Sequence, residues 1–238
     1  AARRGSFHRH PCHAMSSSSL RPRRYDLIVF DWDGTLFDST ALIVRAIQAA
    51  CRDLGAPVPS DEAAAHVIGL GLQDALQHAV PDLPVDLYPE LGRRYRQHYF
   101  ASHDQVTLFA GVPELLAGLR ERNHWLAVAT GKNRHGLNEA LRISGLAGSF
   151  DATRTADETR SKPHPQMLQE LMREFGTDPE RTLMIGDTTH DLQLAANAGT
   201  DAVAVAYGAH PPEQLGDLRP LTIAHSVPEL QDWLARHG

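Results

Sequence analysis

The sequence has few of the features that mark secreted, metal-clustered or membrane-bound proteins. Only two cysteines occur, Cys12 and Cys51. They are too few for a disulfide framework and lack the CxxC spacing of a metal site, so a reducing, cytoplasmic location is the simpler prediction. No apolar run approaches the roughly 18 residues of a membrane span. Cys51 stands among apolar helix positions and is predicted to be a small core residue.

An excess of positive charge is also absent. The formal net charge is −6 and the pI is about 6.1, so the whole chain does not attract nucleic acid or an anionic membrane. An anionic substrate would have to be met by local cations. The 238 residues, 42% of them hydrophobic, suffice for one large domain or for a core domain with an insertion.

Acidic residues are missing before Asp26, whereas six arginines and a run of four serines occur there. Such a composition is found in transit peptides. The simpler interpretation is that Met15 is the initiator and that residues 1–14 are an extension. Residues 1–24 are predicted to be a disordered leader, because they could not form a core.

Short apolar runs after this leader predict buried strands, and helical patterns alternate with them. Strands are expected at 25–30, 125–129, 182–185 and 202–206, with a weaker one at 221–224, and helices at 113–122, 134–143, 165–175 and 189–198. Strands that alternate with helices indicate a parallel sheet covered on both faces. The predicted fold class is α/β, with a doubly wound, Rossmann-like parallel sheet.

The stretch 39–108 breaks this alternation. It shows helical patterns at 40–54, 61–67, 71–79 and 86–102, separated by glycine and proline, and no convincing strand. It is therefore predicted to be a small helical domain inserted into a core made of residues 25–38 and 109–238. Arg93, Arg94 and Arg96 in the last of these helices are expected to form a solvated outer face.

Acidic side chains follow two of the predicted strands. Asp31 and Asp33 come directly after the first strand, and Asp187 and Asp191 follow strand 182–185. The carboxyl ends of parallel strands meet at one edge of the sheet, where ligands bind in open α/β folds. Four acids at one edge repel one another and provide only oxygen ligands, which favours a hard cation such as Mg²⁺ over zinc.

A single aspartate after a strand is more often a turn former or a helix cap. Asp38 or Ser39 is expected to have that role for the helix that begins near residue 40. Helix capping does not require doubled acids at two matched strand ends, so it does not explain the two pairs.

Two further segments carry groups suited to phosphate. Thr130 and Gly131 end the second predicted strand and head a helix, where a hydroxyl and amides can hold phosphate oxygens, although Thr-Gly is also an ordinary turn. Lys162 lies in a loop stiffened by Pro163 and Pro165. A lone lysine is usually a solvated surface charge, but a fixed lysine at an acidic crevice can offset phosphate and aspartate charge.

In this order the four segments resemble the haloacid dehalogenase superfamily, and within it subfamily IA, the phosphoglycolate-phosphatase-like group with a helical cap. The matching motifs are DxDGTLxDS at 31–39, Thr130, SKPHP at 161–165 and GDxxxD at 186–191. The resemblance covers roughly residues 25 to 236. The first and last motifs are highly specific, whereas Thr130 and Lys162 support the resemblance mainly through their positions and order in the chain.

The resemblance implies a role for each matching residue. Asp31 would be the nucleophile, and Asp33 would first protonate the leaving group and then activate water. The transferred phosphoryl group would lie against Asp31, Gly34, Thr130, Gly131 and Lys162. Mg²⁺ would be held by the side chains of Asp31 and Asp187 and the backbone carbonyl of Asp33, with Asp191 holding its water shell or orienting Lys162.

The same resemblance implies a phosphatase acting on a small phosphorylated metabolite. Asp33 argues against dehalogenases, which lack an acid there. The absence of lysine from residues 40–108 argues against phosphonatases, and the nearly apolar loop 66–72 lacks the signature of hexose-phosphate mutases. Phosphoglycolate is the leading substrate, with sugar phosphates and nucleotides open. A phosphotransferase or phosphomutase on sugar phosphates and a catalytically silent phospho-ligand binder remain as alternatives, and either a monomer or a homodimer is compatible.

Three arginines are candidate cations for a carboxylated substrate. They are Arg45, Arg52 and Arg134, each of which is also expected to be a solvated helix residue. Trp32, between the two acids, is predicted to pack behind the site because side chains alternate along an extended segment. His190 is expected to be an exposed residue at a helix start rather than part of the site.

Overall fold

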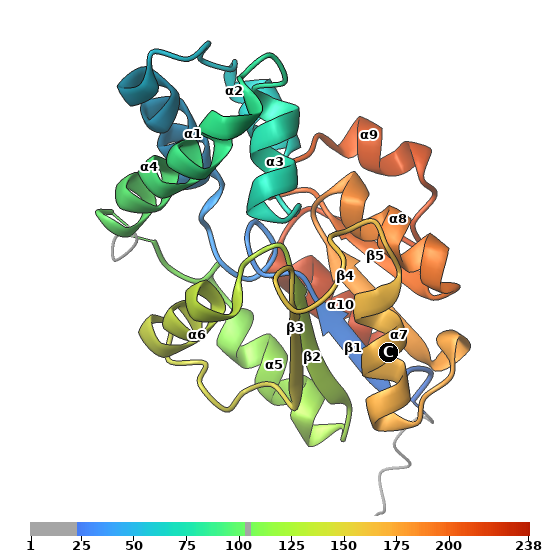
Figure 1. Ribbon diagram of the computed structural model, residues 1–238. Helices are drawn as coiled ribbons and strands as arrows, with labels where there is room; N and C mark the ends of the chain where they lie inside the picture. The colour runs from blue at the N-terminus through green and yellow to red at the C-terminus, as the bar shows by residue number, and fades with distance from the viewer. Residues whose placement is uncertain (1–22, 103–105) are drawn as a thin grey trace, which may run out of the picture.

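The computed structural model of the protein describes residues 23–102 and 106–238 (Figure 1). Its centre is a six-stranded parallel sheet in the order β3-β2-β1-β4-β5-β6. The strands are β1 Leu27–Phe30, β2 Trp125–Thr130, β3 Ala152–Thr155, β4 Thr182–Gly186, β5 Asp201–Val205 and β6 Ile223–Ala224. The order reverses at β1, so the crevice at the carboxyl end of β1 and its two neighbours is the expected ligand site of such a sheet.

The central strands are buried on both faces, as their continuous apolar sequences require. Every residue of β1 and β4 is buried, and so is β2 from Leu126 onward. Helices α5 Val112–Glu121, α6 Arg134–Ile143 and α10 Val227–His237 cover one face, and α7 Gln166–Phe175 and α8 Thr189–Ala198 cover the other. The short helix α9 Pro212–Asp217 packs beside α8. This is the predicted α/β class.

Four helices lie between β1 and α5 and form a second layer above the sheet edge (Figure 1). They are α1 Thr40–Leu54, α2 Asp61–His66, α3 Leu72–Ala79 and α4 Tyr88–Phe100, and we call them the cap helices. They share a hydrophobic core of their own, in which Cys51 is fully buried as predicted. The exact division of the chain into a core domain and the domain 39–108 stays a prediction.

Most elements confirm the sequence-based expectations, and the exceptions have a simple cause. Strand β3 was missed because its sequence, Ala-Thr-Arg-Thr, is polar and lies at the edge of the sheet. Helices α9 and α10 at the end of the chain were also not predicted. None of the helices in the described ranges is both long and apolar enough to cross a membrane.

The predicted leader lies almost entirely outside the described residues. Of its 24 positions only Arg23 and Arg24 are described. Arg23 pairs with Asp26 at 2.8 Å, and Arg24 pairs with Asp201 at 2.8 Å.

Candidate active site

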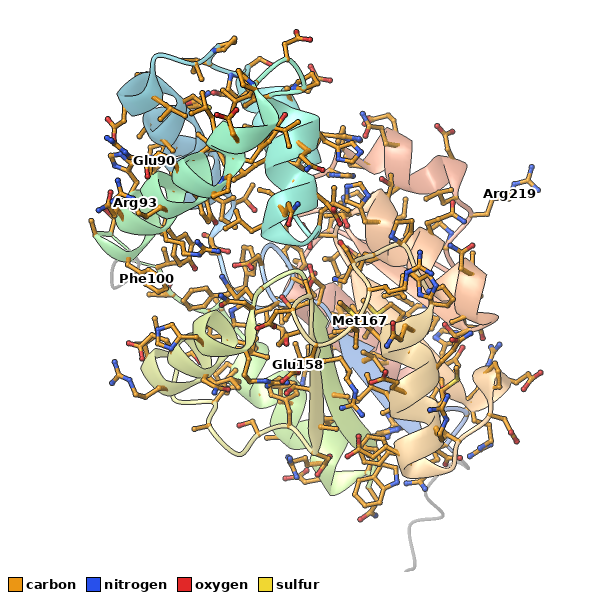
Figure 2. The ribbon with its side chains drawn as sticks, in the orientation of Figure 1. Glu90, Arg93, Phe100, Glu158, Met167 and Arg219 are labelled. Carbon is orange, nitrogen blue, oxygen red and sulfur yellow. The ribbon has the colours of Figure 1, made fainter. Side chains whose placement is uncertain are left out.

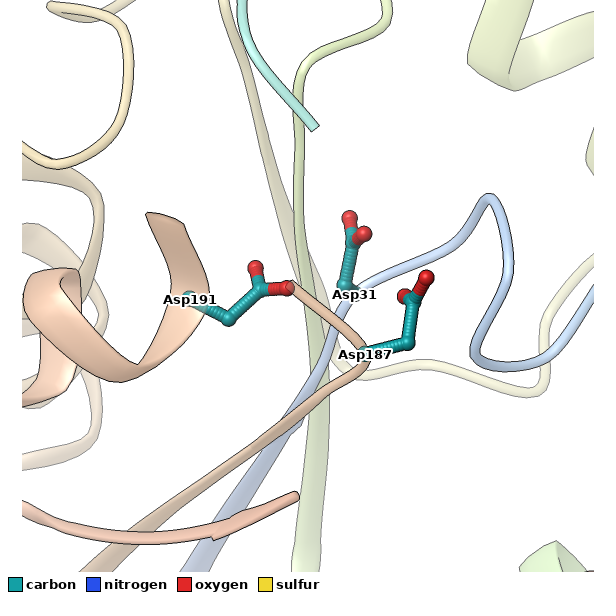
Figure 3. A group of neighbouring side chains, drawn as sticks. All are labelled: Asp31, Asp187 and Asp191. Atoms are coloured by element: carbon teal, nitrogen blue, oxygen red, sulfur yellow. The ribbon is translucent and has the colours of Figure 1, made fainter. Parts of the chain in front are cut away.

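Three buried aspartates meet at the carboxyl end of the sheet (Figure 3). Asp31 follows β1, Asp187 follows β4, and Asp191 lies in the first turn of α8. One carboxylate oxygen of each lies within 4.8 Å of the other two. Because β1 and β4 are parallel neighbours with Phe30 level with Ile185, the register of the sheet brings the first two together. We call these three residues the acidic cluster.

Lys162 is the cation of the acidic cluster. Its Nζ lies 2.8 Å from Asp31 Oδ1 and 2.7 Å from Asp191 Oδ1, and its side chain is fully buried. Burial acts to lower the pKa of Lys162, but the Asp191 and Asp31 carboxylates outweigh it and raise the pKa. One ammonium group therefore faces three carboxylates, which is an excess of negative charge in a buried place.

This excess is visible in the acids themselves. Burial raises the pKa of Asp31 well above its ordinary range; Lys162 opposes the shift, and Asp191 and Asp187 add to it. Burial and then Asp191 raise the pKa of Asp187 to about 7. A bound cation would favour the ionised carboxylates and reverse these shifts.

The hydrogen bonds of the cluster show which oxygens could bind a metal. Asp31 Oδ2 is buried and has no hydrogen-bond partner among the described residues. The two oxygens of Asp187 each accept one bond, from the Thr35 hydroxyl at 2.7 Å and from the Ala209 N–H at 2.7 Å, so each keeps a lone pair. An oxygen-only set of this kind fits Mg²⁺.

Asp191 is more fully occupied. Its Oδ2 accepts from the N–H and the hydroxyl of Thr188 at 3.0 and 2.7 Å. Its Oδ1 accepts from Lys162 at 2.7 Å. Asp191 thus closes a capping box at the start of α8 and fixes Lys162 at the same time.

Three glycines leave room for these aspartates. A Cβ on Gly34 or on Gly208 would lie 2.2 Å from Asp187 Oδ2, and a Cβ on Gly186 would lie 2.3 Å from Asp191 Cβ. Gly34 also has a φ of +82°, which other residues rarely adopt. Gly34, predicted to bind phosphate, lies directly against Asp187 in the structure.

The side chain of Asp33 is directed away from the acidic cluster. Its Oδ1 accepts from the Ser39 hydroxyl at 2.6 Å and lies 3.1 Å from Lys132 Nζ. Ser39 occupies the N-cap position of α1, but its side chain makes no capping hydrogen bond. The expectation that Ser39 caps the helix is wrong in this respect, because its hydroxyl is used to hold Asp33.

Lys132 is a site residue that the sequence analysis missed. Its Nζ donates to the Tyr99 hydroxyl of α4 at 2.9 Å and lies 4.5 Å from the centre of the Tyr99 ring. Its side chain is only 10% exposed. Lys132 and Lys162 are the only lysines in the sequence, and both lie beside an aspartate of the site. The small number of lysines, together with the position of Lys132 after Thr130-Gly131, could have identified Lys132 as a site residue from the sequence.

Thr130 and Gly131 lie at the same sheet edge, at the end of β2. Thr130 is fully buried, and its hydroxyl accepts from the Lys132 N–H at 3.2 Å. A Cβ on Gly131 would lie 2.3 Å from the carbonyl oxygen of Leu70. The chain before α3 therefore packs directly on the end of β2, and only glycine allows this approach.

This covering segment, residues 66–71, we call the cap loop. The His66 carbonyl oxygen accepts from the Nε2 atoms of His190 at 2.8 Å and His210 at 3.0 Å. The Gly71 N–H donates to the Ser161 hydroxyl at 2.9 Å. The expectation that His190 is exposed is therefore wrong, because it is half-buried against the cap loop. These bonds hold the cap loop against the core and leave the acidic cluster buried.

A pocket of about 440 Å³ lies between the cap helices and the core, beside Asp33. It is bounded by the cap loop, α3 and α4 on one side and by residues 131–136 on the other. The three aspartates of the acidic cluster do not line it. Its volume is in the range of small-molecule sites.

Most of the described arginines are solvent-facing, as expected, and only Arg96 among them lines the pocket. Arg134 pairs with Glu158 at 2.6 Å, and Arg45 and Arg52 are exposed and do not line the pocket. Arg93 and Arg94 pair with Glu90 on the outer side of α4, as expected (Figure 2). Arg96 is exposed as well, as expected, but it also lines the pocket.

Trp32 packs behind the site, as predicted. It is fully buried, and its ring lies 5.6 Å from that of Phe37 and 6.4 Å from that of Phe150, measured between ring centres. It therefore supports the segment that carries Asp31 and Asp33.

Comparisons with known proteins agree with this geometry. The family model for haloacid dehalogenase-like hydrolases matches residues 28–205. The probable phosphatase IndB of Dickeya dadantii (strain 3937) is 37% identical over 211 residues, which cover 86% of this chain and 91% of that protein. A phosphoglycolate phosphatase of Aliivibrio fischeri is 32% identical over 203 residues, covering 82% of this chain and 89% of that protein.

Among solved structures, a predicted phosphoglycolate phosphatase from Haemophilus somnus 129PT is similar over nearly its whole length. The alignment covers 89% of this chain and 98% of that one, with a TM-score of 0.79 and 26% sequence identity. The similarity includes the cap helices as well as the sheet, because so little of either chain is left out.

Proposed function

Because the chain belongs to the haloacid dehalogenase-like hydrolase family, we propose that it is a Mg²⁺-dependent phosphatase for a small, phosphoglycolate-like phosphate monoester. The reaction would pass through a phospho-aspartate on Asp31. The observation that carries the proposal is the buried Asp31 Oδ2, which has no protein partner among the described residues, beside Lys162 and two further carboxylates.

In the first step one oxygen of the Asp31 carboxylate would attack phosphorus, forming an acyl phosphate while the bond to the leaving oxygen breaks. Lys162 would neutralise charge on the phosphoryl oxygens, and the Thr130 hydroxyl and Gly131 N–H lie at the same edge to donate to them. Mg²⁺, held by Asp31 and Asp187, would supply further positive charge against the phosphoryl group.

Asp33 would act on the opposite side of the reacting phosphorus. It would give a proton to the leaving alkoxide and in the second step take a proton from the water that hydrolyses the acyl phosphate. Ser39 and Lys132 hold its carboxylate, and the pocket beside it would receive the leaving group. Since Asp31 is only 1% exposed, substrate entry requires the cap loop to move off the core.

The test is phosphate release from a panel of esters: phosphoglycolate, hexose and pentose phosphates, nucleotides and p-nitrophenyl phosphate. Each is measured with Mg²⁺ and with a chelator, using the wild type and Asp31→Asn. Release that requires Mg²⁺ and is lost in Asp31→Asn is the expected result. Binding of phosphate analogues without turnover of any ester would favour the silent binder, and phosphoryl transfer to added sugars would favour the transferase.

A further inference from the structure

Helix α4 lines the pocket beside Asp33 with two hydrogen-bond donors whose polar groups are not used on the described part of the protein. They are the Tyr95 hydroxyl and the Arg96 guanidinium of α4. Neither makes a hydrogen bond or an ion pair to the described part of the chain, whereas the other cation of the pocket, Lys132, is committed to Asp33 and Tyr99. Guanidinium groups beside a cavity are the usual partners of carboxylates and phosphates.

These donors belong to one region of the pocket. The Tyr95 ring centre lies 5.9 Å from that of Tyr99, whose hydroxyl accepts from Lys132. Burial raises the pKa of Tyr95, and the charges of Lys132 and Arg96 oppose that shift without cancelling it. Tyr95 thus stays a protonated donor at neutral pH.

Gly92 lies beside the Arg96 guanidinium. It precedes Arg96 by one turn, and a Cβ on Gly92 would lie 3.8 Å from an Arg96 terminal nitrogen. The guanidinium therefore lies back along α4. Arg93, in contrast, extends outward and pairs with Glu90 (Figure 2).

Three carboxylates line the pocket and limit what it can bind. Asp33 is held by Ser39 and Lys132. Asp157 is occupied, since its Oδ1 accepts from the Arg134 N–H at 2.9 Å and the Thr155 hydroxyl at 2.7 Å. Asp74 of α3 has no ion-pair partner among the residues described and would repel an anion placed next to it. An anionic ligand group would therefore lie on the α4 side of the pocket.

Resting on the proposed function, we infer that Arg96 and Tyr95 bind a carboxylate on the leaving group, so that the enzyme selects phosphate esters of small hydroxy acids. Arg96 is a specificity-determining residue in this arrangement and takes no part in the transfer of the phosphoryl group. A water molecule occupies about 30 Å³, so a pocket of about 440 Å³ also accepts acids longer than two carbons.

The test uses two pairs of esters that differ only in a carboxylate replaced by CH₂OH. They are phosphoglycolate with ethylene glycol monophosphate, and 3-phosphoglycerate with glycerol 3-phosphate. The wild type is expected to favour the acid of at least one pair by about 10-fold or more in kcat/KM, the size of a charge-assisted contact. Arg96→Gln should bring that ratio close to one by raising KM for the acid, and Tyr95→Phe should lower it by a smaller factor.

Two matched variants accompany these measurements. Arg93→Gln changes the neighbouring arginine that faces outward and should leave the ratio unchanged. Asp74→Asn should increase the preference for the acid, because it removes the opposing carboxylate. Equal losses on both members of a pair in Arg96→Gln, or no loss, would overturn the inference and leave the phosphatase proposal intact.

Binding is measured separately from turnover. Phosphoglycolate and ethylene glycol monophosphate are titrated calorimetrically into Asp31→Asn with Mg²⁺, and Arg96→Gln in that background should weaken only the binding of the acid, by about 10-fold. If the wild type hydrolyses no ester but this difference remains, the proposed function fails and the carboxylate site stands. If the two ligands bind equally tightly with Arg96 present, the inference fails.

Discussion

The acidic cluster and the pocket beside Asp33 are neighbours but are built in opposite ways. In the cluster nearly every polar atom is bonded to the chain: Asp191 uses both oxygens and Lys162 bridges two carboxylates. In the pocket, Tyr95 and Arg96 have no such partner among the described residues. Side chains that are hydrogen-bonded within the protein are held in place for one chemical step. Side chains whose donors are free can bind a ligand and so select between ligands.

This difference gives a rule for variants. Changes in the acidic cluster should affect every substrate by the same factor, whereas changes in the pocket should affect substrates differently. Lys132, which contacts Asp33 on one side and Tyr99 of the cap helices on the other, lies between the two regions and should show both effects.

The largest effect is expected for Lys162→Met. Loss of the ammonium group leaves the transferring phosphoryl group without its protein cation, and we expect kcat to fall by about 10³-fold for all esters alike. Thermal unfolding with Mg²⁺ checks that the variant folds, since Asp31 and Asp191 lose their partner. Arg173→Met, an exposed change on α7, is the control. A loss of kcat that differs between substrates would contradict the distinction between the acidic cluster and the pocket.

Lys132→Met should have a smaller effect, about 10- to 100-fold in kcat, because Asp33 keeps the Ser39 hydroxyl but loses its ion pair. Tyr99→Phe removes only the hydroxyl that accepts from Lys132 and should cost a few-fold. Steady-state kinetics on one acid and its CH₂OH analogue measure both variants. If Tyr99→Phe were as damaging as Lys132→Met, the contact with the cap helices would matter more than the ion pair.

Gly131→Ala tests the closed position of the cap loop. A Cβ there would lie 2.3 Å from the Leu70 carbonyl oxygen, whereas a Cβ on Gly118 in helix α5 would meet nothing within 4 Å. We expect Gly131→Ala to lower kcat/KM by about 10-fold, since closure is obstructed. Gly118→Ala should leave activity unchanged and stabilise the protein by about 0.5–1 kcal/mol. Wild-type kinetics in Gly131→Ala would show that closure on this loop is not required.

The smallest effect concerns stability and pH. Without metal, the raised pKa of Asp187 gives stability that is present below the ordinary carboxylate pKa of about 4 and is lost as the pH rises through about 7. The raised pKa of Asp31 acts in the same direction. Mg²⁺ binds the ionised carboxylates. Its addition should therefore raise Tm more at about pH 8 than at about pH 6, and Asp31→Asn should reduce that difference. Equal shifts at both values would argue against a metal at the acidic cluster.

The part of the site that follows strand ends could be predicted from the sequence, because parallel register alone brings Asp31 and Asp187 together. The number of aspartates at this edge of the sheet could also be predicted, but the directions of their side chains could not. Asp33 faces Lys132 and Ser39 because of the turn between β1 and α1, and no periodicity reports that turn. The roles assigned to these residues stay predictions.

The pocket was harder to foresee. Arg93 and Arg96 look alike in a charged helical run and both are exposed, yet Arg93 pairs with Glu90 and only Arg96 lines the pocket. Their difference depends on how α4 packs on the other cap helices, which is a property of tertiary contacts and not of the local pattern. Edge strand β3 was missed for a related reason, since its polar sequence gains its pairing only from β2.

The chain has only two lysines, and both side chains are covered when the cap loop lies on the core. Apart from the α-amino group, these two lysines are therefore the only amines that an amine-reactive reagent can modify. The rate at which Lys132 and Lys162 become acylated would report how often the molecule opens. Mass spectrometry could follow that opening in the unmodified wild-type protein, with each lysine in its own peptide, and bound phosphate analogues should slow the labelling of both.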